Sequence, residues 1–201
     1  NQTYPWRKAL GFCLKKDGDI CWVARSSPKC LAVSSSDCAP VVVALNAEFR
    51  LVGLEGERRV PVGQFYNNDG INYLNKNEDE LLASIHFPQY ECWLMNYKKL
   101  RRRDSIDFPI LGVAMALRLE NNGDCAEARI VLGAVASCPI RAFEAEKILS
   151  GKSLTNERIE EVSQVAAKLA KPMDNTDMTL GFRKKMVAQF VKETIKEALT
   201  S

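Results

Sequence analysis

A basic stretch that follows a tyrosine carries the strongest local charge in this sequence. Residues 98–103 contain five basic side chains, with Tyr97 before them and Asp104 and Asp107 after them. A solvated surface loop is one interpretation of this stretch. A site for an anion or partner is the other, because an aromatic ring beside fixed cations and carboxylates can hold a flat, hydrogen-bonding ring system.

Three of the seven cysteines lie within the first 30 residues. Cys13, Cys21 and Cys30 are separated by seven and eight residues. Thiolates bind iron–sulfur clusters, but such clusters normally take four of them. The spacing therefore leaves two interpretations open, free thiols and a cluster whose fourth ligand lies elsewhere. We expect the other four cysteines to be thiols of the core: Cys38, Cys92, Cys125 and Cys138.

Motifs for hydrolysis and for nucleotide binding are absent from the sequence. The single histidine, His86, lies in an alternating strand pattern before Pro88, which favours a structural role. One histidine cannot build a multi-histidine zinc site, and no Gly-x-Ser-x-Gly elbow supports a Ser-His-Asp triad. Neither Gly-x-Gly-x-x-Gly nor a Gly-x4-Gly-Lys-Ser/Thr loop occurs, so this chain alone offers no standard nucleotide site.

The composition is that of a globular domain of 201 residues, with 46% hydrophobic and 26% charged residues. The net charge of +3 is too balanced to imply nucleic acid or an anionic membrane as a partner. The longest nearly uncharged apolar stretch, at 108–117, is about half of the roughly 20 residues that a membrane-spanning helix needs. With no signal-peptide pattern at the start, we expect a cytoplasmic chain.

The hydrophobic pattern predicts an α+β fold in two regions. In the first region we expect a strand at 30–33, a helix at 41–45, a hairpin formed by 48–54 and 59–62, and a long polar loop at 64–77. The second region is expected to form a meander of strands at 80–87, 92–100, 108–119 and 126–135. Three helices should then cover one side of this antiparallel sheet, at 141–149, 155–169 and 179–199.

Several separated segments resemble one family, the FAD-binding medium subunits of molybdenum hydroxylases such as carbon monoxide dehydrogenase and xanthine dehydrogenase. They follow the family order along nearly the whole chain. The matching segments are 34–45 (Ser-Asp-x-Ala-Pro), 56–62 (Arg-x-Val-Pro), 80–85 (Glu-Leu-Leu-x-x-Ile), 97–107 (Tyr-x-Lys-x3-Arg-x3-Asp), 128–133 (Ala-Arg-Ile-x-Leu-Gly) and 182–188, which is similar to the family's Tyr-Arg-x-x-Met helix.

The resemblance implies three parts. Residues 1–32 would be an iron–sulfur-type cysteine loop, 33–77 the second part, or remnant, of an FAD-binding α+β domain, and 78–201 the C-terminal domain with an antiparallel sheet and a three-helix layer. The family's front half, with its Gly-rich pyrophosphate loops, has no counterpart in this chain. We therefore expect the chain to be the C-terminal part only, and to bind FAD weakly or not at all without that N-terminal half.

The first 30 residues are similar to one branch of the family, typified by the medium subunit of 4-hydroxybenzoyl-CoA reductase. That branch carries an additional 4Fe-4S cluster on an inserted loop, and the resemblance implies that Cys13, Cys21 and Cys30 are three of its ligands. In that branch another cysteine precedes the segment that matches residues 1–3, so the fourth ligand would lie outside this chain.

Carried over residue by residue, the resemblance places Tyr97, Lys99, Arg103 and Asp107 near the flavin, with Leu82 as an apolar contact and Asp37 as a weaker candidate. It implies an electron-transfer subunit of an oxidoreductase that has no catalytic residue of its own for the substrate. Its partners would be a large subunit with the molybdenum cofactor, a small subunit with 2Fe-2S clusters, and an external carrier such as ferredoxin. The alternative is a docking module without a cofactor of its own.

Overall fold

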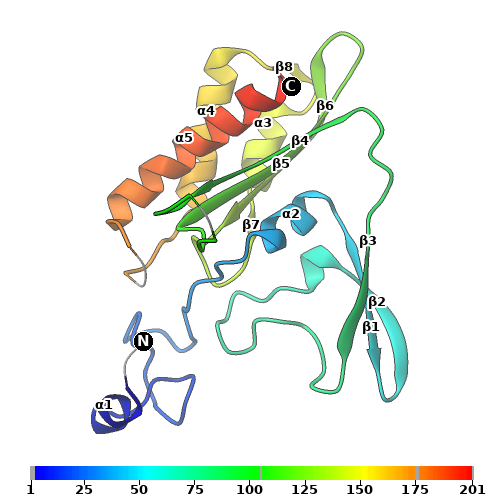
Figure 1. The fold of residues 1–201 in the computed structure, drawn as a ribbon. Helices are drawn as coiled ribbons and strands as arrows, with labels where there is room; N and C mark the ends of the chain where they lie inside the picture. Colours follow the sequence, from blue (N-terminus) through cyan, green and yellow to red (C-terminus); the bar gives the residue numbers. More distant parts are fainter. Residues whose placement is uncertain (1–2, 105, 175–176, 201) are drawn as a thin grey trace.

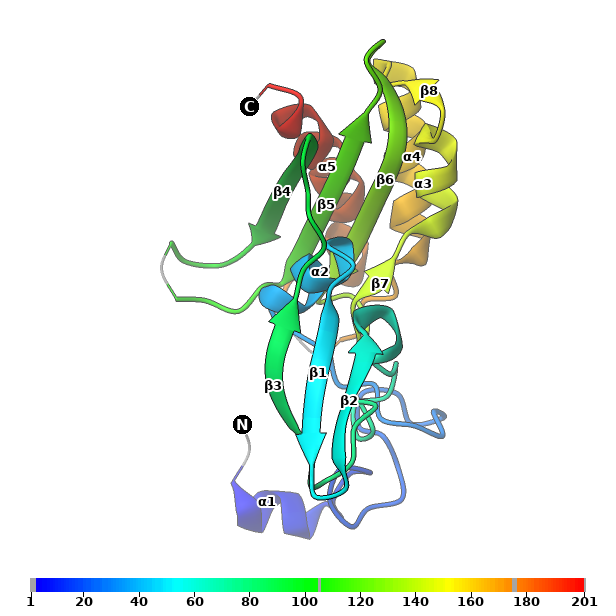
Figure 2. The same cartoon turned by 90° about the vertical axis from the view of Figure 1, so that its right-hand side faces the viewer.

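The computed structural model describes residues 3–104, 106–174 and 177–200. It is an α+β fold with two antiparallel sheets, stacked end to end in Figures 1 and 2. The smaller sheet has the order β2-β1-β3, made of β1 (Glu48–Gly53), β2 (Gly56–Pro61) and β3 (Leu81–His86). The larger has the order β4-β5-β6-β7, made of β4 (Trp93–Leu100), β5 (Leu111–Leu119), β6 (Asp124–Gly133) and β7 (Ile140–Arg141), and β8 (Lys152–Ser153) pairs with β6.

Three helices cover one face of the larger sheet, as the sequence predicts. The helices are α3 (Phe143–Leu149), α4 (Asn156–Leu169) and α5 (Leu180–Ala198). Two of them begin at threonine N-caps, because the hydroxyls of Thr155 and Thr179 accept backbone N–H bonds from Arg158 and Phe182. Among the described residues, no helix combines the length and apolar character needed to cross a bilayer.

The other face of the larger sheet is buried as well, because α2 (Cys38–Ala44) packs between the two sheets (Figure 2). The side chains of β5 alternate between two cores. Val113 and Met115 face the three helices, whereas Ala114 joins Phe49 and Leu51 of β1 in the core around α2. Burial on both faces explains why this strand reads as a continuous apolar run rather than an alternating one.

The strand at 81–86 was assigned to the wrong sheet at the sequence level. We expected it to open the meander of the second region, but β3 pairs antiparallel with β1 in the smaller sheet. Its pairing joins residues that lie 29 to 38 positions apart in the sequence, from Val52 with Leu81 to Glu48 with His86, and periodicity cannot reveal such contacts. Two further differences are local: residues 30–33 form no strand, and α1 (Tyr4–Ala9), a short helix capped by Thr3, was not predicted.

The expectation that four cysteines are core thiols holds for only two of them. Cys125 and Cys138 are buried, and burial raises the pKa of both thiols. Cys38 and Cys92 are exposed. Cys38 begins α2 and Cys92 lies in a loop with a positive φ of 62°, so neither position points its side chain into a core.

A fully buried arginine joins three loops beneath the helical layer. Arg183 of α5 donates hydrogen bonds to the carbonyl oxygens of Ala134 at 2.7 Å, Met173 at 3.0 Å and Ile110 at 3.5 Å. Burial lowers the pKa of this guanidinium, which no carboxylate accompanies among the described contacts. Five donors in a rigid fork allow one arginine to satisfy carbonyls from three segments.

We expect Arg183→Met to lower the free energy of unfolding by about 2–4 kcal/mol, because buried carbonyls lose their donors while the packing volume is kept. Urea unfolding measures the change. Lys184→Met, on the exposed side of the same helix, is the matched control and should change stability by less than about 0.5 kcal/mol. Equal stability of the two variants would contradict the structural role of Arg183.

Candidate functional site

The carboxylate of Asp37 connects the start of α2 to the edge strand β4. Asp37 precedes α2, and its side chain makes no hydrogen bond to the helix backbone. Its two oxygens instead accept hydrogen bonds from other segments: Oδ1 from the Tyr97 hydroxyl at 2.8 Å and Oδ2 from the Lys99 ammonium at 2.8 Å. Tyr97 and Lys99 follow Asp37 by 60 and 62 residues in the sequence. The fold brings the three side chains into one ionic cluster.

Alternation along β4 explains why Tyr97 and Lys99 act together while Lys98 does not. Residues i and i+2 of a strand share a face, and residue i+1 points to the other. Lys98 therefore extends to α5, where its ammonium lies 2.6 Å from carboxylate oxygens of Glu193 and Glu197. The two adjacent lysines thus lie on opposite faces of the sheet, with Lys99 on the α2 side and Lys98 on the side of the three helices.

The loop after β4 folds back onto the same lysine. The Lys99 ammonium also donates to the backbone oxygen of Asp107 at 2.9 Å. The Asp107 carboxylate accepts N–H bonds from Arg102 at 2.9 Å and Arg103 at 3.3 Å, and these bonds, partly opposed by burial, lower the pKa of this carboxyl. The Arg103 guanidinium lies 3.8 Å from Asp107 and remains 69% exposed.

The phenol of Tyr97 is held in its protonated form. Burial and the hydrogen bond to Asp37 both raise its pKa well above the ordinary value, because each disfavours a phenolate. The ring packs on β5, where a Cβ added to Gly112 would lie 3.0 Å from the Tyr97 hydroxyl. Tyr97 can therefore act as a hydrogen-bond donor and apolar surface, and not as a base at neutral pH.

The fold brings together most of the residues predicted for the flavin, with one exception. Asp37, Tyr97, Lys99, Arg103 and Asp107 form the connected cluster described above. Leu82 lies apart on β3 of the smaller sheet, 45% exposed, and none of the described contacts joins it to the cluster. Its role as an apolar flavin contact stays a prediction.

The sequence prediction missed the exposed thiol of Cys38. This residue follows Asp37 directly and lies close enough to Tyr97 and Tyr66 that its charged form would raise the pKa of both phenols. No local pattern in the sequence signals this exposure, because it depends on how α2 packs between the two sheets.

The N-terminal cysteine loop is built around tight turns. The backbone oxygen of Cys13 accepts N–H bonds from Lys16 at 2.8 Å and Gly18 at 3.2 Å, with Asp17 at a positive φ of 56°. A Cβ on Gly18 would lie 1.5 Å from the Phe12 oxygen, so only glycine fits there. These turns determine the direction of the Cys13 side chain, which is partly exposed.

Cys21 and Cys30 are buried and adjacent in this loop. Burial acts to raise the pKa of the Cys21 thiol, but N–H groups of Leu31, Ala24 and Val23 and the Cys30 side chain lower it, and the net pKa falls below the ordinary value. Cys13 does not join them. Across the described ranges, no group of three or more His, Cys, Asp or Glu side chains is arranged to hold a metal ion.

Two family models match this chain, one over its C-terminal segment and one over the segment before it. Residues 95–198 match the CO dehydrogenase flavoprotein C-terminal domain, and residues 18–90 match the FAD binding domain in molybdopterin dehydrogenase. The first match covers more than half of the chain.

The chain belongs to the CO dehydrogenase flavoprotein C-terminal domain family. Individual relatives agree with this assignment. The glyceraldehyde dehydrogenase medium chain of Sulfolobus acidocaldarius is 29% identical over 164 residues, which cover 81% of this chain and 57% of that relative. Xanthine dehydrogenase 2 of Arabidopsis thaliana is 32% identical over 130 residues, which cover 62% of this chain and 9% of that protein.

The fold agrees with a solved member of the same group of proteins. A chain of carbon monoxide dehydrogenase from Hydrogenophaga pseudoflava superimposes with a TM-score of 0.77 at 26% identity, over 83% of this chain and 57% of that one. This chain thus spans a little over half the length of the medium-chain relatives that it matches. Within the flavoprotein family, the Asp37 cluster has a defined place: Asp37 comes from the FAD-binding segment, and Tyr97 and Lys99 from the C-terminal segment.

Removal of the Asp37 charge should lower the pKa of Tyr97. In Asp37→Asn, the negative charge that disfavours the phenolate is gone and a neutral amide oxygen replaces the charged acceptor, while burial remains, so the pKa should fall but stay above that of a free tyrosine. Alkaline titration followed by tyrosinate absorbance measures the shift, and Tyr97→Phe identifies the band. Asp69→Asn is the control, since this partly exposed carboxylate accepts the Ile71 N–H and does not contact Tyr97 in any described interaction. An unchanged titration in Asp37→Asn would contradict the geometry.

Proposed function

We propose that this chain is part of the FAD-binding, electron-transfer subunit of a molybdenum hydroxylase complex in the cytoplasm. The observation that carries the proposal is the cluster of Asp37, Tyr97 and Lys99 at the junction of the two family segments. The wider complex would include a large subunit with the molybdenum cofactor, a small subunit with 2Fe-2S clusters, and an external carrier such as ferredoxin.

The residues of the cluster fit a flavin ring. FAD supplies the capacity to take up and release electrons when it is bound. Lys99 is a cation held by two oxygen acceptors and only 19% exposed, so it keeps its position and is weakly screened by solvent. Its charge would stabilise negative charge on a neighbouring ring, and its third N–H is left to donate to that ring. Tyr97, whose one O–H is donated to Asp37, would offer its aromatic face. Asp37 positions both groups.

The domain limits derived from the resemblance remain part of this proposal, with 1–32 as the cysteine loop, 33–77 as FAD-binding segment and 78–201 as C-terminal domain. The pyrophosphate and adenosine would be held by the N-terminal half of the subunit. The 4-hydroxybenzoyl-CoA reductase type is the branch we favour, because residues 1–30, with cysteines at 13, 21 and 30, resemble that branch.

Lys99→Met should weaken FAD binding by the full-length subunit about tenfold or more, equivalent to about 1.4 kcal/mol, and lower the flavin reduction potential, because a fixed cation is lost from the ring's surroundings. Flavin fluorescence titration and a redox titration measure the two effects. Lys98→Met is the matched control: the neighbouring lysine pairs with Glu193 and Glu197 on the helical side and should leave both quantities unchanged.

The alternative function, a docking module without a cofactor of its own, makes the opposite prediction. Lys99→Met and Lys98→Met would then leave FAD content alone, and changes at α5 would weaken association with the other subunits. FAD binding that is equal in both lysine variants and the wild type, with a loss of subunit pull-down in the Lys98 variant, would replace our proposal with this one.

A 4Fe-4S cluster on the cysteine loop is a second component of the proposal. It is supported by the backbone N–H groups around Cys21, since hydrogen bonds to sulfur favour the thiolate that iron requires, and by the adjacency of Cys21 and Cys30. The proposed ligands are Cys13, Cys21, Cys30 and a fourth outside this chain. In the three described ranges Cys13 stands apart, so assembly would require the turn at 13–18 to move inward.

We expect Cys21→Ser in the full-length subunit to lose most of its iron and its broad visible absorbance. The matched control is Cys125→Ser, a buried thiol of the core around β5 and β6, which should retain both. Iron analysis after anaerobic purification is the measurement. Iron content that does not differ between the two variants, or iron absent from the wild type, would leave the cysteines as structural thiols.

A further inference from the structure

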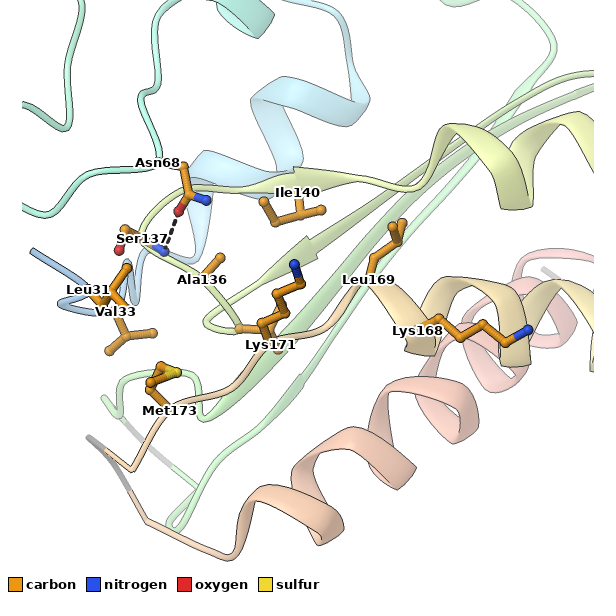
Figure 3. Close-up of a pocket in the computed structure, with 11 residues that line it drawn as sticks. Leu31, Val33, Asn68, Ala136, Ser137, Ile140, Lys168, Leu169, Lys171 and Met173 are labelled. Carbon is orange, nitrogen blue, oxygen red and sulfur yellow. Dashed lines mark hydrogen bonds between the residues drawn. The ribbon is translucent and has the colours of Figure 1, made fainter. Parts of the chain in front are cut away.

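A cavity of about 480 Å³ lies away from the Asp37 cluster. Three segments form most of its wall: the chain just after Cys30, residues 135–140 up to the start of β7, and the C-terminal end of α4 with the residues that follow it (Figure 3). Asn68, from the loop before β3, completes the wall. Neither Asp37 nor any β4 residue lines it. A volume in the range of a few hundred Å³ is typical of small-molecule sites.

Most of the cavity surface is apolar. The apolar side chains come from all three segments, so the cavity is not a gap within one element. They are Leu31, Val33, Val135, Ile140, Leu169 and Met173. A surface of this kind favours an apolar ligand body, because burial of its carbon atoms is the main favourable term.

One polar group in the wall lacks a partner. Ser137 is 5% exposed, and its hydroxyl has no hydrogen-bond partner within the described part of the chain. Its backbone N–H donates to Asn68 Oδ1 at 3.2 Å, which orients the Asn68 amide along the same wall (Figure 3). A buried hydroxyl without a partner is costly, and a ligand oxygen would relieve that cost. Ser137 also borders a smaller cavity of about 340 Å³ beyond Val33.

Two lysines lie at the cavity, and they differ in direction. In Figure 3 the side chain of Lys171 reaches up among the lining residues, whereas that of Lys168 extends away from them. Neither lysine has a hydrogen bond or ion pair with any residue that the structure describes, and Lys171 is also exposed to solvent. A cation without a counter-ion beside an apolar cavity favours an anionic group on whatever enters.

We propose that this cavity binds a small organic monocarboxylate with an apolar body. The apolar body would lie against Val135, Ile140 and Leu169, and the carboxylate would pair with the Lys171 ammonium and accept the Ser137 hydroxyl bond. One lysine that reaches among the lining residues and one buried hydroxyl without a partner in the described part of the chain match one carboxylate, whereas a phosphate or dicarboxylate would bring more charge than these groups neutralise. The site is separate from the flavin cluster and does not depend on the proposed redox function.

Octanoate is the probe, added to the full-length protein and followed by isothermal titration calorimetry. We expect saturable one-site binding, and about tenfold weaker binding of octanamide, which has the same shape without the charge. Lys171→Met should weaken octanoate binding about tenfold and leave octanamide binding unchanged. Ser137→Ala should weaken octanoate binding by a smaller factor, about threefold.

Lys168→Met is the matched control, since this lysine lies at the same cavity but its side chain extends away from it. This variant should bind octanoate as tightly as the wild type does. Circular dichroism of each variant confirms folding, and FAD content shows that the flavin site is untouched. The proposal is overturned if octanoate does not bind, if octanamide binds equally well, or if Lys168→Met and Lys171→Met lose affinity alike. A loss in Ser137→Ala alone would move the site to the smaller cavity and also overturn it.

Discussion

The candidate site depends on one shared carboxylate. Asp37 stands at the start of α2 and accepts bonds from both Tyr97 and Lys99, which project from one face of β4. A carboxylate with two charge-assisted or aligned partners is strongly oriented. The position of α2 therefore determines where the Lys99 ammonium and the Tyr97 hydroxyl lie. A shift of α2 relative to the sheet would shift both groups.

The packing of α2 sets strict limits on side-chain size beneath it. A Cβ on Gly133 of β6 would lie 3.1 Å from Pro40 of α2, and a Cβ on Gly112 of β5 would lie 3.0 Å from the Tyr97 hydroxyl. Gly112 and Gly133 are cross-strand partners, and Ala114 continues this surface of small side chains two residues further along β5. Small residues on β5 and β6 let the helix and the tyrosine approach the sheet closely, so core packing and site geometry are parts of one contact.

The segment after Cys30 links the cysteine loop to the cavity. Gly70 bonds the Cys30 backbone oxygen at 2.9 Å, and Ser34 exchanges backbone bonds with Ala134 and Ala136. Leu31 and Val33, between these anchors, face the cavity. A cluster bound to the cysteine thiols and a ligand in the cavity would both stabilise the folded conformation of residues 31–33, because a ligand that binds only the folded form stabilises that form.

The sequence alone determined the three C-terminal helices, the hairpins and the composition of the site, because these follow from local periodicity, caps and turn residues. The three C-terminal helices are predicted almost to the residue, and the Tyr97 to Asp107 stretch contains the groups that gather at Asp37. Only the tertiary structure decided that β3 pairs with β1, that Leu82 lies apart and that Cys38 is exposed. Those outcomes depend on contacts between distant segments, which no local pattern encodes.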